Sequence, residues 1–368
     1  MAAPHKLSVQ GLKLADWAYP VGALVVFAAV TALGFGGRFD PTPMGFAVAA
    51  VILFVLFGTV FAAVHHAEAL AHRAGEPFGT LILTIAVIVI EVALIASLML
   101  SPDASPSLAR DTVFAVIMIV CNGLVGLCIL AGGLRYREQG FRVTGASLYI
   151  TVLGALATIT LVLPNATVAT PGPAYSTGQL AYVSFATVAL YGAFLYIQTV
   201  RHKEFFVGHE ADHAEGAAGG IATNAVLLVV ALLAVILLSK SFAAVVEAGV
   251  AAAGAPAGVA GIVVAILILM PEGLTAVRAA RRNQLQRSIN LSLGSSLATI
   301  GLTVPVVAVV STLLGKELVL GLDQKDTVLL ALTLLISVLT FGTGRTNILY
   351  GFVHLVVFAT FLFLAVVP

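Results

Sequence analysis

The sequence predicts an all-α polytopic membrane protein with about eleven transmembrane helices. Two observations support this fold class. Of the 368 residues, 60% are hydrophobic and only 10% are charged, a composition typical of membrane proteins. Apolar runs also recur at the length of roughly 20 residues that a helix needs to cross a bilayer. The net charge of +1 gives no sign of a nucleic-acid partner.

The apolar runs place the predicted helices at 19–36, 44–64, 79–100, 112–131, 144–163, 177–199, 222–239, 257–277, 288–314, 327–342 and 346–367. Lys and Arg are enriched in cytoplasmic loops. With the N-terminus inside, thirteen of these residues are cytoplasmic and five lie on the other side. We therefore expect a multi-pass protein of the cytoplasmic (inner) membrane, N-terminus in and C-terminus out. No cleavable signal peptide is expected, because the first 16 residues are polar.

A polar loop at 201–221, rich in His and acidic residues, divides the predicted helices into two blocks. Residues 1–43 hold a leading helix, 44–200 a first block of five helices, and 222–368 a second block of five. An odd number of helices per block gives the two blocks opposite orientations, so the sequence predicts two inverted five-helix repeats. The motif A-G-x-P-x-G supports this, since it precedes the third span at Gly79 and the eighth at Gly258.

Two carboxylates are predicted deep in the apolar layer, Glu91 in the third span and Glu272 in the eighth. The other fifteen acidic residues fall in loops or near helix ends. A charge at the bilayer centre costs roughly 2.5–3.5 kcal/mol, and no basic residue is predicted at that depth. Burial favours the protonated carboxyl, as required of a group that exchanges a proton for a metal cation. A neutral glutamic acid bonded to a neighbouring helix is the structural alternative.

The segment L-I-L-M-P-E-G predicts a helix break at Glu272. Pro271 has no N–H to donate to the Leu267 carbonyl, and Gly273 tolerates the altered backbone. Freed carbonyl oxygens beside a carboxylate suit a hard cation. An ordinary proline kink is the alternative. Because only the eighth span shows this pattern, we expect a more regular helix around Glu91 and two unequal half-sites.

Polar residues of two further spans are candidates for the same site. Asn122 stands alone in the apolar fourth span, and the ninth contains N-L-S-L-G-S-S-L-A-T. Small residues also permit close helix packing, which is an equal explanation for the serines. Cys121 and Cys128 are two helical turns apart and too far from each other for a disulfide. The candidates for cation and proton binding are Glu91, Glu272, Asn122, Ser295, Ser296 and Thr299.

At these residues the sequence resembles the calcium/cation antiporter superfamily of the calcium/proton exchanger type, and the bacterial sodium–potassium (calcium)/proton antiporters in particular. The signature E-x-L-A-x-R-x-G-E-x-x-G is matched by Glu68, Leu70, Ala71, Arg73, Gly75, Glu76 and Gly79, with Glu91 in register twelve residues later. A second signature is matched by Glu272, Gly294, Ser295, Ser296 and Leu297, and a third by Asn347 and Gly351. The sequence departs from the family pattern at four places. Val87-Ile88 and Ile268-Leu269 stand where the family has Gly-Asn. Gly273 replaces a histidine, and Ala298 replaces a glutamine.

The resemblance implies a secondary active antiporter, not an enzyme, that exports Ca²⁺, or Na⁺ or K⁺, in exchange for H⁺ by alternating access. Glu91 and Glu272 would bind the transported metal cation and the proton in turn, and no resident cofactor is expected. A monovalent Na⁺/K⁺ antiporter without Ca²⁺ transport is the main alternative, because Ca²⁺ usually takes six to eight oxygen ligands and the amide ligands are missing. Membrane lipid and inorganic cations are the expected partners, and a homo-oligomer is compatible with the sequence.

Other polar residues allow further interpretations. Glu68, Glu76 and Glu247 are candidates for relay or entrance carboxylates, with plain interfacial charges as the alternative. The histidines of the polar loop suggest pH sensing or divalent-ion binding, against a merely solvated loop. A remote alternative is a membrane-embedded metal-dependent enzyme, because His65, Glu68 and His72 share a helical face. A passive channel is also compatible with the pattern.

Overall fold

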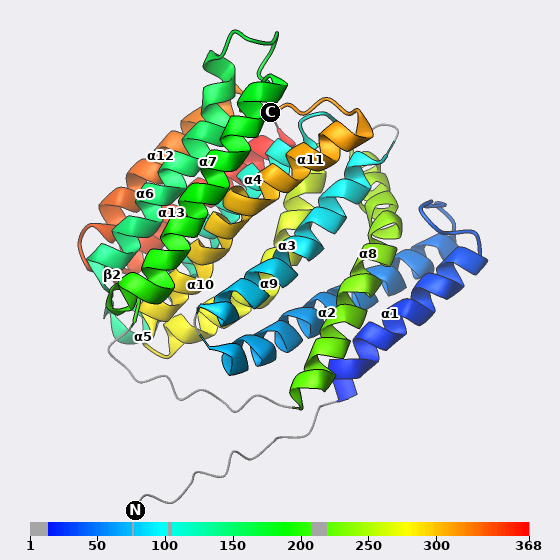
Figure 1. Ribbon diagram of the computed structural model, residues 1–368, viewed down its shortest axis with the longest axis horizontal. Coiled ribbons are helices and arrows are strands. Elements are labelled where there is room, and N and C mark those ends of the chain that lie inside the picture. The colour runs from blue at the N-terminus through cyan, green and yellow to red at the C-terminus, as the bar shows by residue number, and fades with distance from the viewer. Residues whose placement is uncertain (1–13, 76, 102–104, 208–218, 368) are drawn as a thin grey trace, which may run out of the picture. The chain divides into compact units, whose positions relative to one another are not determined.

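The computed structural model describes residues 14–75, 77–101, 105–207 and 219–367 (Figure 1). Within them, eleven helices are long and apolar enough to cross a membrane, which confirms the predicted number. Seven are regular α-helices: α1 (Leu14–Ala32), α2 (Pro43–Ala74), α3 (Phe78–Met99), α8 (Ile221–Ala252), α9 (Val259–Arg281), α12 (Gln324–Phe341) and α13 (Ile348–Val366).

The other four spans contain π-helical segments, η1 (Ile119–Leu124), η2 (Thr158–Val162), η4 (Ile197–Arg201) and η6 (Thr299–Thr303). The regular parts of these spans are α4 (Leu108–Met118), α5 (Val125–Tyr136), α6 (Val143–Ala157), α7 (Thr177–Tyr196), α10 (Leu285–Ala298) and α11 (Val304–Leu314). Short 3₁₀ turns are η3 (Leu163–Ala166) and η5 (Lys203–Phe205). π-Helical turns often occur at functional sites, and η1 and η6 contain two of the candidate residues.

Two helices extend well beyond their predicted ends. The second span was expected at 44–64 and runs over Pro43–Ala74, and the seventh was expected at 222–239 and runs over Ile221–Ala252. Both extensions, 65–74 in α2 and 240–252 in α8, are rich in Ala, which has the highest helix propensity. The start of α2 is fixed by Thr42, whose side chain accepts a hydrogen bond from the Gly45 N–H at 3.1 Å.

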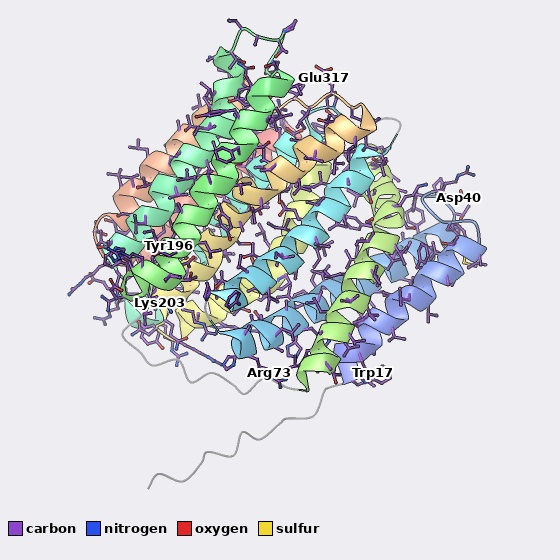
Figure 2. All side chains as sticks on the ribbon, viewed as in Figure 1. Trp17, Asp40, Arg73, Tyr196, Lys203 and Glu317 are labelled. Carbon is purple, nitrogen blue, oxygen red and sulfur yellow. The ribbon has the colours of Figure 1, made fainter. Side chains whose placement is uncertain are left out.

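The helices form two compact units, and the chain passes from one to the other inside α3 and inside α8. Unit 1 takes its described residues from Met1–Ala93 and Glu210–Val245, and unit 2 from Leu94–His209 and Val246–Pro368. In unit 1, α1 packs along α2. The labelled side chains in Figure 2 mark the two ends of this helix pair, with Trp17 and Arg73 at one end and Asp40 at the other.

Unit 2 is built around the span α4–η1–α5. In the apolar stretch of this span, 89% of the residues are buried. Helices α9, α10 and α13 pack against this central span. The crossing of α13 over α5 requires glycine at Gly351, because a Cβ there would lie 2.9 Å from the Leu130 nitrogen and 3.0 Å from the Gly126 oxygen. Gly351, predicted from the third signature, is therefore a packing residue in this structure.

A two-stranded antiparallel ladder links two loops of unit 2. Strand β1 (Glu138–Gly140) follows α5, and β2 (Arg345–Asn347) precedes α13. Glu138 pairs with Asn347, Gln139 with Thr346 and Gly140 with Arg345. The ladder thus joins the α5–α6 connection to the α12–α13 connection through backbone hydrogen bonds.

Candidate cation-binding site

Glu91 is fully buried in α3, within unit 1. Its neighbours along the helix, Val87, Ile88 and Ile90, are all less than a tenth exposed. The two positions where the resembled family has Gly-Asn are thus filled by buried apolar side chains. The burial predicted for this carboxylate is confirmed, and α3 offers it no amide from one turn earlier.

Glu272 is 9% exposed in α9, within unit 2. The predicted helix break is absent, because α9 is one continuous helix over Val259–Arg281 with Pro271 inside it. Pro271 still lacks the N–H that would donate a hydrogen bond to the Leu267 carbonyl. The helix continues on both sides of it, because α4, α5 and α10 pack against α9. The expectation that α3 would be more regular than α9 is therefore wrong, since both are uninterrupted.

Close packing brings α9 against the central span. A Cβ at Gly261 would lie 2.9 Å from the Thr112 nitrogen, so α9 and α4 touch at backbone distance. At Gly273 a Cβ would lie 3.4 Å from the Leu124 side chain, an ordinary contact with η1. Gly273 therefore lies against η1 in a regular helix, and the backbone freedom inferred from the sequence is not used.

Asn122 is fully buried in η1 and belongs to a polar network that sequence reasoning missed. Its Nδ2 donates to Thr333 Oγ1 of α12 at 2.8 Å, and its Oδ1 is 3.2 Å from Nδ1 of His354 in α13. His354 Nε2 is 3.0 Å from Thr340 Oγ1. A histidine in an apolar span needs such partners, and that signal in G-F-V-H-L-V-V could have identified His354.

The ninth-span candidates differ in burial. Ser296 and Thr299 are buried, and Ser295 is half-buried. The Ser296 hydroxyl has no hydrogen-bond partner within the part of the chain that the structure describes. Because α10 packs against both α9 and η1, unit 2 collects Glu272, Asn122 and Ser296 on three mutually packed segments. Glu91 lies in unit 1.

The candidate relay carboxylates lie in different surroundings. Glu247 Oε2 accepts a hydrogen bond from Ser101 Oγ at 3.0 Å, which connects α8 to the end of α3 within unit 2. Glu68 is exposed on α2. Glu76 lies outside the described residues. Gly79, the last residue of the motif A-G-x-P-x-G, has a packing role, because a Cβ there would clash with the Ala71 oxygen.

The histidine clusters do not form a metal centre among the residues described. His65 Nε2 is 3.8 Å from Asp16 Oδ1, and His72 is exposed. In the polar loop, His202 stacks on Phe205 and lies 3.1 Å from Glu204 Oε1. Hydrogen bonds from its own backbone and from His202 hold the pKa of Glu204 below its usual range. His209 and His213 lie outside the described residues.

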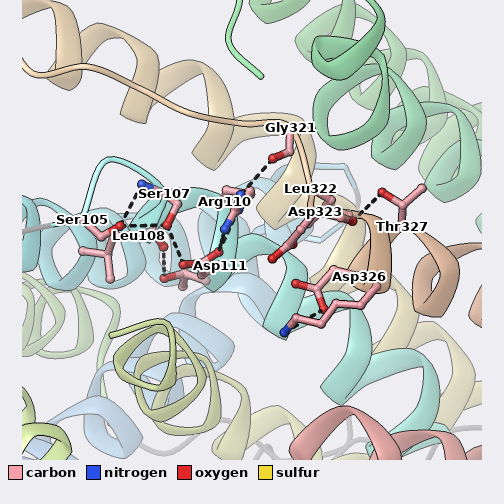
Figure 3. Close-up of polar contacts among 12 residues, drawn as sticks. Ser105, Ser107, Leu108, Arg110, Asp111, Gly321, Leu322, Asp323, Asp326 and Thr327 are labelled. Carbon is pink, nitrogen blue, oxygen red and sulfur yellow. Dashed lines mark hydrogen bonds and ion pairs between the residues drawn. The ribbon is translucent and has the colours of Figure 1, made fainter. Parts of the chain in front are cut away.

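A charged cluster at one end of unit 2 ties α4 to the segment before α12 (Figure 3). Arg110 Nη2 is 2.7 Å from Asp111 Oδ1, and Arg110 Nη1 donates to the Gly321 oxygen at 2.9 Å. Ser107 Oγ donates to Asp111 Oδ2 at 2.9 Å. Arg110 therefore contacts both Asp111 in α4 and the backbone of Gly321 in the segment before α12.

Among the described residues, eleven apolar spans and one buried glutamate in each unit fit a membrane transporter that exchanges ions. The family model described as sodium/calcium exchanger protein matches residues 44–200 and 223–367, and the chain belongs to this family. Its members are transporters and exchangers, not enzymes, which sets aside the metal-dependent enzyme. The predicted family resemblance is confirmed.

Three relatives define this likeness. The chain is 48% identical to the y4hA protein of Sinorhizobium fredii over 85% of this chain and 87% of that protein. It is 41% identical to the sodium-potassium/proton antiporter ChaA of Escherichia coli, over 94% of each. The structure of YfkE, described as a Ca²⁺/H⁺ antiporter, has a TM-score of 0.73 at 16% identity and covers 96% of this chain and 100% of its own. At that identity YfkE shows the fold alone.

Proposed function

We propose that this protein is a cytoplasmic-membrane antiporter that exchanges Na⁺ or K⁺ for H⁺, with Ca²⁺ as the second candidate cation. The observation that carries the proposal is the burial of Glu91 and Glu272, at 0% and 9% exposure, in two apolar spans. Each carboxylate binds either a proton or a cation. Because both ligands compete for the same oxygens, movement of one is coupled to movement of the other.

The preference for a monovalent cation rests on the oxygens near the carboxylates. Ca²⁺ usually takes six to eight oxygen ligands. Apolar Val87-Ile88 and Ile268-Leu269 precede the two glutamates, and the amide of Asn122 is already bonded to Thr333 and His354. Ser296 and Thr299 complete the proposed set. The sodium-potassium/proton activity in the name of the relative at 41% identity favours the same cations.

Alternating access is proposed to arise from two inverted five-helix repeats, 44–200 and 222–368, with the N-terminus in the cytoplasm. The two segments matched by the family model, 44–200 and 223–367, agree with this division. The π-helical segments η1 and η6 also fall in the third helix of each repeat. A homo-oligomer in the bilayer is compatible with this scheme.

Purified protein in liposomes with an imposed pH gradient tests the proposal. Cation-dependent proton efflux is measured across Na⁺, K⁺ and Ca²⁺ in one preparation. Glu91→Gln and Glu272→Gln are each expected to reduce exchange at least about 100-fold, because the amide cannot exchange a proton for a cation. Exchange at the wild-type rate in either variant would refute the site.

Glu138→Gln is the matched control, because Glu138 is an exposed carboxylate paired only loosely with Arg345 at 3.8 Å. It is expected to exchange normally. Exchange driven by Ca²⁺ but by neither Na⁺ nor K⁺ would replace the monovalent assignment. Cation flux that ignores the proton gradient would indicate a channel.

A further inference from the structure

A row of three serines follows one face of α10 in unit 2. Ser288, Ser292 and Ser296 are four residues apart, and each side chain is 1% exposed or less. In an α-helix this spacing places them on the same face at intervals of about 6 Å. The row begins three residues after the start of α10 at Leu285. It therefore carries one buried hydroxyl per turn from the end of the helix into its interior.

Small side chains of two neighbouring helices line the same space. The hydroxyls of Ser288 and Ser292 face the thiol of Cys128 in α5. Cys128 in turn packs with Ala276 and Ala280 of α9. Helices α5, α9 and α10 pack against one another, and these five residues together with Ser296 form what we call the serine seam. Its walls are hydroxyls, one thiol and methyl groups.

The serine seam leads from the end of unit 2 that holds the β1–β2 ladder toward Glu272. At the ladder end, a Cβ at Gly132, one turn beyond Cys128, would overlap the amide oxygen of Gln139. At the inner end, Glu272 lies nine residues before the end of α9, and Ser296 lies eleven residues after the start of α10. These depths are about 14 Å and about 17 Å along two adjacent helices. The seam thus connects Gln139 with the level of the buried carboxylate.

Polar atoms at the two ends of the seam distinguish it from ordinary packing. The Ser296 hydroxyl and Gln139 Oε1 are buried and have no hydrogen-bond partner anywhere in the described ranges. A serine that serves only helix packing can donate to the carbonyl four residues earlier, as Ser292 does to the Ser288 oxygen at 2.9 Å. An unbonded buried polar atom is costly. Both atoms are therefore suited to a ligand that comes and goes, such as water or a cation.

One larger apolar side chain lies between the seam and the carboxylate. Leu124 is one turn deeper than Cys128 and belongs to the same packed cluster. A Cβ at Gly273, the residue after Glu272, would lie 3.4 Å from the Leu124 side chain. Leu124 is itself buried. Apolar constrictions stop ions by excluding water, so Leu124 closes the inner end of the seam in this structure.

We propose that the serine seam is the route by which a monovalent cation and its water reach Glu272 from the ladder end, with Leu124 as the gate. The proposal rests on the cation/proton exchange proposed above. The hydroxyls replace part of the hydration shell of the ion, one turn after another. Conduction needs sites that bind an ion weakly enough to release it to the next, and single hydroxyls satisfy this requirement. Glu272 is the first carboxylate that the ion meets along the seam.

Cysteine accessibility tests the route. Both native cysteines are first removed as Cys121→Ala and Cys128→Ala. Ser292→Cys is then compared with Leu293→Cys, since the two positions are adjacent, equally buried and on different sides of α10. Proteoliposomes are treated with a positively charged, water-soluble methanethiosulfonate, and modification is followed by mass spectrometry. Because the reagent needs a hydrated thiolate, Ser292→Cys should react at least about 10-fold faster. Equal rates at the two positions would overturn the route.

The charged adduct on Ser292→Cys should also block exchange, and a thiol reductant that removes the adduct should restore it. Exchange that continues at full rate after complete modification would refute passage along the seam. Recovery after reduction excludes misfolding as the cause of the block.

The gate is tested in the same cysteine-free background with Ser296→Cys as the reporter. Adding Leu124→Ala should raise its rate of modification about 10-fold, because the apolar barrier to water is removed. Leu293→Ala, at a position outside the seam, should leave the rate unchanged. A rate that Leu124→Ala does not alter would exclude Leu124 as the gate. Thiol reactivity does not depend on transport, so fast modification of Ser292→Cys in a protein without exchange would refute the proposed function and leave the aqueous seam standing.

Discussion

The two compact units differ in how deeply their spans are buried. In the apolar stretch of each span, 17% of the residues are buried in α1 and 44% in α2 of unit 1. In the central span of unit 2, 89% are buried. Lipid is as apolar as the helices, so association in a membrane depends on close packing and on interhelical hydrogen bonds. Both units use close packing at glycine, at Gly351 in unit 2 and at Gly58 in unit 1, where a Cβ would clash with the Tyr19 ring; α1 is also bonded to α2 through His66.

The buried histidines sharpen this contrast. His66 and His354 are both fully buried, but their partners differ. His66 lies between two oxygens that only accept. His354 lies between the Asn122 oxygen and the Thr340 hydroxyl, which both donates and accepts, so a neutral ring satisfies both of its partners. The two buried histidines therefore differ in the kind of partner that each ring nitrogen faces.

Gly351→Ala tests the packing of α13 against α5 in unit 2. The new Cβ would lie 2.9 Å from the Leu130 nitrogen, and the helices must separate to admit it. We expect a loss of about 1–3 kcal/mol in the free energy of unfolding, measured by SDS titration in mixed micelles. Gly192→Ala is the control, because a Cβ there meets nothing within 4 Å. Equal stability of the two variants would contradict packing as the main contribution.

A smaller effect is expected from Thr333→Val, which keeps the side-chain shape and removes the hydroxyl that accepts from Asn122. The loss of this buried hydrogen bond should cost about 1 kcal/mol in the same titration. Thr360→Val removes an exposed hydroxyl that bonds only within its own helix and should change stability less. A larger loss for Thr360→Val would show that the Asn122 network adds nothing to unit 2.

The smallest effect is expected from Glu138→Gln. Its ion pair with Arg345 is 3.8 Å long, and both side chains are more than half exposed. Such pairs contribute under about 0.5 kcal/mol once solvent screening is included. An unfolding curve that overlays the wild type is the expected result, and a clear shift would mean that surface charge matters more here than packing suggests.

Features that depend on hydropathy and on the position of rare charges could be predicted from the sequence. The eleven spans follow from the bilayer thickness, and the burial of Glu91 and Glu272 follows from their position in apolar runs. The π-helical segments around Asn122 and Thr299 could not be predicted, because one extra residue per turn leaves no compositional trace. The break predicted at Pro271 is absent, because local propensity does not include the helices that pack against α9. The hydrogen bonds of His66 could not be predicted, because its two acceptors are 50 and 158 positions away in the sequence.

The β1–β2 ladder has a consequence for how this chain tolerates change. Its bonds join backbone to backbone between Glu138–Gly140 and Arg345–Asn347, so most substitutions in these loops leave it intact. A single inserted residue is different, because it shifts the register and turns each following side chain to the opposite face. Buried Gln139, which donates to the Ala280 oxygen at 2.9 Å, would then point into solvent. Loop length, more than loop sequence, is the property that natural variation must conserve at this point.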